Sequence, residues 1–159
     1  MRSRVIVLAG PSGAGKSHLA TRLGLPVLRL DDYYKDGDDP SLPMIDLAGG
    51  DPIVDWDDPR SWDADRAVAA LAELCHTGRT DAPTYDIAAS AHVGHRVLDL
   101  GDAGLFLAEG IFAHEIVRDC RERGLLADAL CITQHPVKTF VRRLVRDLRE
   151  HRKPPLVLV

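Results

Sequence analysis

The sequence predicts an α/β protein in which helices flank a mostly parallel sheet. Short, wholly apolar runs, typical of strands buried on both faces, alternate with longer segments whose apolar residues recur every three or four positions. Alternation of this kind predicts βαβ units. A length of 159 residues, of which 45% are hydrophobic, fits one domain with a sizeable core. We therefore expect a single domain over residues 1–159.

The first elements are two strands and a helix. The apolar, β-branched run at residues 5–9 predicts a buried strand, and residues 26–30 predict a second one. Between them, residues 16–23 carry apolar side chains at helical spacing, and Gly24 follows as a left-handed cap.

The middle of the chain is predicted to contain a long loop, a helix and a hairpin. Residues 35–59 are rich in Asp, Gly and Pro and lack periodicity, which favours a surface loop that carries function. A helix capped by Ser61 is expected to run to Gly78. Residues 84–87 and 96–100 are expected to pair as a small β-hairpin.

The last third repeats the strand and helix alternation. Apolar runs at residues 105–108 and 129–133 predict two more strands of the sheet. Helices are expected at residues 112–123 and from Pro136 onward, where proline fits the first helical position.

A glycine-rich loop links the first strand to the first helix, and its sequence, Gly10-Pro11-Ser12-Gly13-Ala14-Gly15-Lys16-Ser17, matches the pattern G-x-x-x-x-G-K-[ST]. In this pattern glycines let successive N–H groups converge on phosphate oxygens, and the helix N-terminus adds its dipole. Lys16 is expected to neutralise the terminal phosphates, and Ser17 to supply a hydroxyl to Mg²⁺. The strand before and the helix after the loop predict a three-layer P-loop NTPase fold that binds ATP and Mg²⁺. The residues expected to contact the nucleotide are Gly10, Ser12, Gly13, Ala14, Gly15, Lys16, Ser17 and His18.

Two acidic residues stand where predicted strands end. Asp31 follows the second strand, where open α/β sheets place ligands, and it is our candidate for the base that accepts a proton from a hydroxyl. The alternative is a turn or capping aspartate, and for its neighbour Asp32 that alternative is preferred. Glu109 ends the strand at 105–108 and is the candidate to hold Mg²⁺ through water; a glutamate favoured only by a helix dipole would look the same.

Arginines gather on the helix expected near the end of the chain. Arg142, Arg146 and Arg149 recur at four- and three-residue steps along one face. Arg142 is expected to contact the nucleotide and Arg146 to act in catalysis, by clamping the phosphates. A solvated charged face is the competing interpretation.

Composition narrows the class of ligand. A net charge of −4 argues against wholesale binding to nucleic acid or to an anionic membrane, which leaves a small-molecule substrate. Cys75, Cys120 and Cys131 lack C-x-x-C spacing and are expected to be reduced, buried thiols in a cytoplasmic protein. The apolar run at 5–9 is too short for a signal peptide or a membrane span.

Six segments together resemble the uridine kinase and phosphoribulokinase-like branch of P-loop kinases. They are GPSGAGKS at 10–17, LDDYYKD at 30–36, VDWDDP at 54–59, PTYD at 83–86, AEGI at 108–111 and RRLVRDLRE at 142–150. The resemblance implies that Asp31 is the catalytic base and that the arginine-rich segment is a helical lid. Because such kinases continue beyond the lid, the domain is expected to be truncated after it.

The resemblance also implies an acceptor site. Tyr34 belongs to the family's tyrosine pair, Asp55 matches an aspartate that binds ribose hydroxyls, and Tyr85 matches a residue that holds a pyrimidine ring. The base-contacting histidine of such kinases is replaced by Ser90, and His92 is the nearest candidate to contact the acceptor.

The function implied is transfer of the γ-phosphate of ATP to a hydroxyl of a uridine- or cytidine-like nucleoside. Pantothenate, nicotinamide riboside or a sugar phosphate would fit the same phosphate machinery. A nucleotide-binding switch with little catalysis is the alternative from another class. The sequence leaves a homo-oligomer open.

Overall fold

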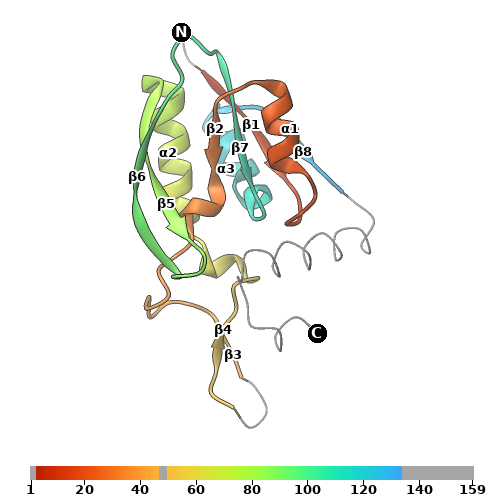
Figure 1. The fold of residues 1–159 in the computed structure, drawn as a ribbon. Helices are drawn as coiled ribbons and strands as arrows, with labels where there is room; N and C mark the ends of the chain where they lie inside the picture. The colour runs from red at the N-terminus through yellow and green to blue at the C-terminus, as the bar shows by residue number, and fades with distance from the viewer. Residues whose placement is uncertain (1–2, 47–49, 134–159) are drawn as a thin grey trace.

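A computed structural model describes residues 3–46 and 50–133, and its centre is a parallel sheet of four strands (Figure 1). In sheet order these are β2 (Val27–Arg29), β7 (Leu105–Gly110), β1 (Arg4–Ala9) and β8 (Leu126–Cys131). All three pairings are parallel. The predicted α/β class is therefore confirmed.

Helices cover both faces of this sheet. Val5, Val7 and Ala9 belong to one core cluster with α2 (Ala64–Thr77) and α3 (Val117–Glu122). Because side chains alternate along a strand, Leu8 faces the other way, and it is also fully buried. On that second side α1 (Lys16–Leu23) packs against β7 (Figure 1).

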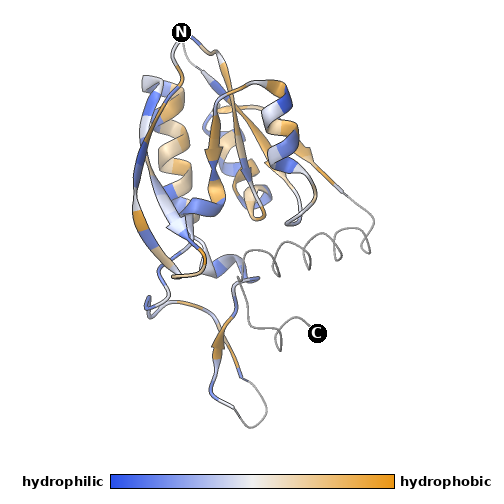
Figure 2. Cartoon of the chain, in the orientation of Figure 1, coloured by the Kyte–Doolittle hydropathy of each residue, from blue (hydrophilic) through white to orange (hydrophobic). Residues whose placement is uncertain are grey.

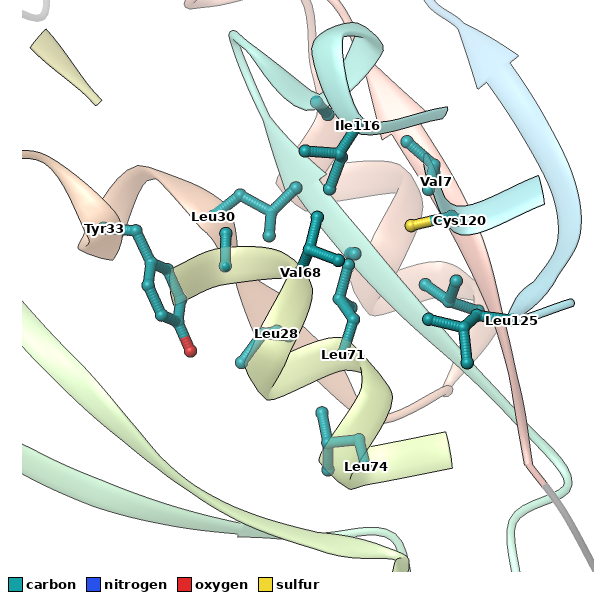
Figure 3. Close-up of a cluster of buried hydrophobic side chains, with 14 of the residues drawn as sticks. Val7, Leu28, Leu30, Tyr33, Val68, Leu71, Leu74, Ile116, Cys120 and Leu125 are labelled. Atoms are coloured by element: carbon teal, nitrogen blue, oxygen red, sulfur yellow. The ribbon is translucent and has the colours of Figure 1, made fainter. Parts of the chain in front are cut away.

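The main core lies between the sheet and α2. In Figure 2 the ribbon is coloured as hydrophobic along much of the strands of the main sheet and along part of α2. In Figure 3 Val68, Leu71 and Leu74 project from α2 among residues of the strands and of the region around α3, as expected for an amphipathic helix. The residues labelled there are Val7, Leu28, Leu30, Tyr33, Val68, Leu71, Leu74, Ile116, Cys120 and Leu125.

The start of α2 differs from the sequence prediction. Its N-cap is Asp63, whose carboxylate accepts from the N–H of Arg66 at 2.9 Å, and not Ser61. Ser61 ends a short 3₁₀ turn, η2 (Pro59–Ser61), and its buried hydroxyl donates to the carbonyl of Asp58 at 2.7 Å. The expected cap failed because proline starts a separate turn ahead of the helix.

Other boundaries shift by a few residues. The strand expected at 26–30 is shorter and corresponds to β2, because Leu30 already begins a 3₁₀ helix, η1 (Leu30–Tyr33). The helix expected at 112–123 begins as a 3₁₀ turn, η3 (Ala113–Ile116), before α3. Cys75 and Cys120 are buried as predicted, but Cys131 is exposed because β8 is an edge strand of the described sheet.

Two antiparallel pairs stand outside the main sheet. The predicted hairpin is present and longer than expected, with β5 (Arg79–Asp86) paired to β6 (Ala91–Asp99). The loop at 35–59 includes a two-residue pair, β3 (Met44–Ile45) with β4 (Ile53–Val54). The predicted lid and the helix from Pro136 lie outside the described residues. Within 3–46 and 50–133 no helix is long and apolar enough to cross a membrane.

Candidate functional site

The glycine loop curls between β1 and α1 as its motif predicts. Gly15, the residue before α1, has a φ of 94°, a left-handed conformation that favours glycine. At Gly10 an added Cβ would lie 2.7 Å from the carbonyl oxygen of Ile132, so only glycine fits against the end of β8. The loop therefore places the first turn of α1 at the carboxyl edge of the sheet.

Lys16 and Ser17 begin α1 and make different contacts. The Lys16 side chain is buried, and its Nζ donates to the carbonyl oxygens of Gly10 at 2.7 Å and Pro11 at 3.2 Å. The Ser17 hydroxyl points to the sheet and donates to Oε1 of Glu109 at 2.8 Å. His18, on the same turn, is exposed.

Strand register explains why Ser17 meets a residue 92 positions away. β1 and β7 are neighbours in parallel, with Leu8 opposite Glu109 and Ala9 opposite Gly110. The loop that leaves β1 therefore emerges beside Glu109, which is 8% exposed and lies inside β7, one residue before its end. A hydroxyl and a carboxylate are ligands that Mg²⁺ prefers, so this pair fits that ion.

In the described part of the chain, no group of three or more His, Cys, Asp or Glu side chains is arranged so that it could hold a metal ion. This does not conflict with magnesium binding, since Mg²⁺ is commonly held by one or two protein oxygens together with substrate phosphates and water.

Asp31 lies against the backbone just beyond Glu109. Its Oδ1 accepts from the N–H of Ile111 at 3.0 Å. Gly110 leaves room for this carboxylate, because a Cβ there would lie 2.9 Å from Oδ1 of Asp31 and 2.8 Å from Cβ of Leu30. The structure thus brings Asp31, Glu109 and Ser17 to one edge of the sheet.

Asp32 points away from this edge and is 2% exposed. Its Oδ1 accepts from the N–H of Tyr85 at 3.5 Å and lies 3.7 Å from Nη2 of Arg29. Burial raises the pKa of its carboxyl above the ordinary 3.8, and the Arg29 charge partly opposes that rise. Asp32 joins η1 to β5, which is a more specific role than the turn or cap expected for it.

The two tyrosines after Asp32 have different surroundings. Tyr33 is 1% exposed among the core residues of Figure 3, and burial raises the pKa of its hydroxyl to about 12. The ring of Tyr34 lies 5.8 Å from those of Trp56 and Tyr85 and 5.9 Å from that of Phe112. Tyr34 therefore belongs to an aromatic cluster built from four separate segments.

The segment that follows Tyr34 is bound to the hairpin. Tyr85 donates its hydroxyl to the carbonyl oxygen of Lys35 at 3.0 Å, and the N–H of Gly37 donates to that of Ser90 at 2.7 Å. Oδ1 of Asp36 accepts from the N–H of His92 at 2.7 Å and lies 2.8 Å from Nδ1 of the same residue. These contacts lower the pKa of the Asp36 carboxyl, with the backbone hydrogen bond the main cause.

A cavity of about 400 Å³ lies beside this contact. Its lining residues are Tyr34, Lys35, Asp36, Asp38, Asp39, Pro40, Asp63, Arg66 and His92. Tyr34 and His92 were predicted to contact the acceptor, and Tyr85 packs edge-on to His92 with ring centres 5.3 Å apart. Asp55 is not among the lining residues; its carboxylate accepts from the N–H of Asp57 at 3.1 Å, beside Trp56.

Sequence reasoning assigned no role to Asp36, Arg66 or Phe112. Asp36 stands inside the LDDYYKD segment, but its partner His92 is 56 residues away, so no local spacing could pair them. Arg66 on α2 and Phe112 after β7 belong to no motif of the sequence. Arg142 and Arg146, expected over the phosphates, lie outside the described residues.

No family model matches this chain. It is 28% identical over 156 residues to inorganic pyrophosphatase TTM2 of Arabidopsis thaliana, an alignment covering 95% of this chain and 21% of that protein. It is 26% identical to the uridine kinase of Lactobacillus helveticus, with 92% of this chain and 68% of the kinase aligned. The chain thus spans about a fifth of the plant protein's length.

A solved structure shares the fold. A "putative fructose transport system kinase" from Silicibacter sp. TM1040 superposes with a TM-score of 0.68 at 17% identity, covering 99% of this chain and 78% of the other. The chain therefore has the fold of P-loop kinases and is similar to uridine kinases over most of its length, as its motifs predict.

Gly110→Ala tests the packing of Asp31 against β7. The new methyl would meet Leu30 and Asp31 at under 3.0 Å, so we expect a loss of about 1–3 kcal/mol in the free energy of unfolding. Chemical denaturation measures it. Gly94→Ala on β6 is the matched control, because its added Cβ meets nothing within 4 Å. Equal stability of the two variants would contradict the close approach.

Asp32→Asn tests the buried carboxylate. Because the folded-state pKa is raised, the folded protein holds this proton more tightly than the unfolded chain, and stability falls as pH rises from below 3.8 through the folded-state pKa. Asparagine does not titrate and keeps an oxygen for the N–H of Tyr85. We expect the variant to gain stability relative to the parent as pH rises through that window, measured by urea unfolding at several pH values. A stability difference that does not change with pH would refute the raised pKa.

Proposed function

We propose that this chain is an ATP- and Mg²⁺-dependent kinase that transfers the γ-phosphate to a hydroxyl of a nucleoside or a similar small molecule. The observation that carries the proposal is the hydrogen bond of 2.8 Å from the Ser17 hydroxyl to Oε1 of Glu109. It lies on the edge of the sheet where Asp31 is also bound. A hydroxyl, a magnesium-binding carboxylate and a second carboxylate together are what phosphoryl transfer to an alcohol needs.

In the proposed reaction Asp31 acts on the acceptor. The acceptor oxygen forms a bond to the γ-phosphorus, its proton passes to the Asp31 carboxylate, and the bond to the β–γ bridging oxygen breaks to release ADP. Bound Mg²⁺ would neutralise charge that develops on the phosphate oxygens. The hydrogen bond from the N–H of Ile111 to Asp31 fixes the carboxylate at this edge.

The glycine loop would hold the triphosphate. We assign nucleotide contacts to Gly10, to residues 12–17 and to His18, because the loop's N–H groups and the dipole of α1 favour anions. Lys16 would exchange the carbonyl oxygens of Gly10 and Pro11 for phosphate oxygens. Arg142 and Arg146 remain proposed contacts of the phosphates.

The acceptor would lie against the aromatic cluster beyond Asp31. We assign it contacts with Tyr34, Tyr85 and His92, which the structure gathers near the cavity, and with Asp55, which stands beside Trp56. A uridine- or cytidine-like nucleoside is the leading acceptor, in keeping with the similarity to a uridine kinase. Other small hydroxyl compounds fit the same phosphate machinery.

Hydrolysis without an acceptor is a second candidate, and a specific observation favours it. The chain aligns over 95% of its length with a plant protein named an inorganic pyrophosphatase. In that case water would take the place of the acceptor hydroxyl at Asp31. A nucleotide switch would instead bind ATP and consume none.

An acceptor screen separates these functions. The protein is mixed with ATP and Mg²⁺, and ADP and phosphate are measured with uridine, cytidine, other ribosides, pantothenate and sugar phosphates. The kinase proposal expects ADP release that depends on one class of acceptor, without free phosphate. Acceptor-independent phosphate release indicates hydrolysis, and ATP binding without turnover indicates a switch; either result overturns the proposal.

Asp31→Asn tests the base. We expect turnover to fall by about 10²–10⁴-fold with little change in ATP affinity, because the carboxylate acts on the acceptor. Steady-state kinetics with varied ATP and acceptor measure both effects. Asp102→Asn, at an exposed position before β7, is the matched control for the exchange of an aspartate. Normal turnover in Asp31→Asn would remove Asp31 from the mechanism.

A further inference from the structure

We propose that the acceptor site selects uncharged or cationic acceptors and disfavours anionic ones, because the cavity beside Tyr34 has an acidic lining. This inference rests on the proposed function, since it names the class of molecule that the same site would take. It separates candidates that the phosphate machinery alone cannot separate.

Two aromatic side chains, Tyr34 and Phe112, lie between the cavity and the backbone that binds Asp31. Tyr34 lines the cavity, and its ring also packs on Phe112 at 5.9 Å. Phe112 directly follows Ile111, whose N–H holds the Asp31 carboxylate. An acceptor whose hydroxyl lies at Asp31 would therefore pass Tyr34 and extend into the cavity, whose volume suits a small molecule.

The lining carries more negative than positive charge. Its carboxylates are Asp36, Asp38, Asp39 and Asp63, and its permanent cations are Lys35 and Arg66. The four carboxylates and two cations leave an excess of two negative charges when His92 is neutral. Such an excess around one cavity attracts cations and repels anions, most strongly at low ionic strength.

The described hydrogen bonds to two of these carboxylates come from neutral donors. Asp39 accepts from the N–H and hydroxyl of Ser41, and Asp63 accepts from the N–H of Arg66. The ammonium of Lys35 donates to the Ser41 hydroxyl at 2.9 Å. Hydrogen bonds from neutral groups do not cancel the negative charge of these carboxylates, so the excess charge of the lining remains.

The negative charge of the lining distinguishes among the acceptors between which the phosphate site does not discriminate. A nucleoside is neutral and nicotinamide riboside is cationic, so both are compatible with the lining. Pantothenate carries a carboxylate and a sugar phosphate carries a dianion, and both would be repelled. The preferred class is therefore a hydroxyl compound without a negative charge at the end remote from the reacting hydroxyl.

Matched ligand pairs test this preference by calorimetric binding to the intact protein. The pairs are uridine with 5-carboxyuridine, nicotinamide riboside with nicotinic acid riboside, and pantothenol with pantothenate. Within at least one pair we expect the ligand without the added carboxylate to bind about tenfold or more tightly at low salt, and the gap to narrow at high salt. Equal binding within every pair, tighter binding of the carboxylates, or no binding by any ligand would overturn the inference.

Asp38→Lys makes the test specific to the cavity. Asp38 is exposed and no hydrogen bond or ion pair is described for its carboxylate, so its replacement leaves the described contacts intact. We expect the preference within the pairs to shrink several-fold in this variant. Asp102→Lys is the control, because it changes the net charge equally, on the loop before β7 and away from the cavity lining. The same shrinkage in both variants would assign the effect to overall charge and refute the inference.

Binding also keeps this inference separate from the proposed function. If the acceptor screen finds no ADP release while the pairs still differ as expected, the kinase proposal fails and the charge preference stands. If an acceptor is phosphorylated while binding ignores charge, the kinase proposal stands and the charge preference fails.

Discussion

The parallel register of β1 against β7 is the constraint on which the candidate site depends. It sets Leu8 opposite Glu109 and Ala9 opposite Gly110, so the glycine loop leaves the sheet beside the acidic end of its neighbour. A shift of one residue would turn every side chain of β1 to the other face, and both faces are buried, so the cost would be spread over the whole core. The hydrogen bond from Ser17 to Glu109 is thus held in place by the packing of apolar residues far from it.

The hairpin beside the proposed acceptor site is attached by different means. The hairpin β5–β6 forms its own two-stranded sheet and shares no ladder with the main one. It is joined to η1 and to the segment after it by hydrogen bonds at Asp32, Lys35, Asp36 and Gly37. These polar contacts, together with a hydrogen bond from Nη2 of Arg96 to the carbonyl oxygen of Val27 at 3.4 Å, tie the hairpin to the backbone carrying Asp31. β5 also packs on η1 and α2.

Local features of the sequence predicted local structure well. The glycine loop, α1 and its cap Gly24 follow from residues within about 15 positions of one another, and they occur where expected. Asp63 replaces Ser61 as a cap because a proline turn intervenes, which neighbouring residues could have indicated. Contacts such as Asp36 with His92 or Tyr34 with Trp56 join segments that are far apart in the chain. The spacing of apolar residues within one segment cannot predict such contacts. Exposure of Cys131 depends on strand order, which is likewise a property of the whole fold.

The position of Lys16 has a consequence for selectivity among anions. Its ammonium is buried and already shared between two carbonyl oxygens of its own loop, so the protein carries an internal competitor for every incoming anion. A singly charged ion that offers one contact would gain little by displacing the two carbonyl oxygens from the Lys16 ammonium. On the proposed function, a polyphosphate would bring several charges and would also engage the N–H groups of the loop, so it would displace these contacts of Lys16. The loop would thereby set a threshold of charge that a ligand must exceed, and simple anions would not occupy it.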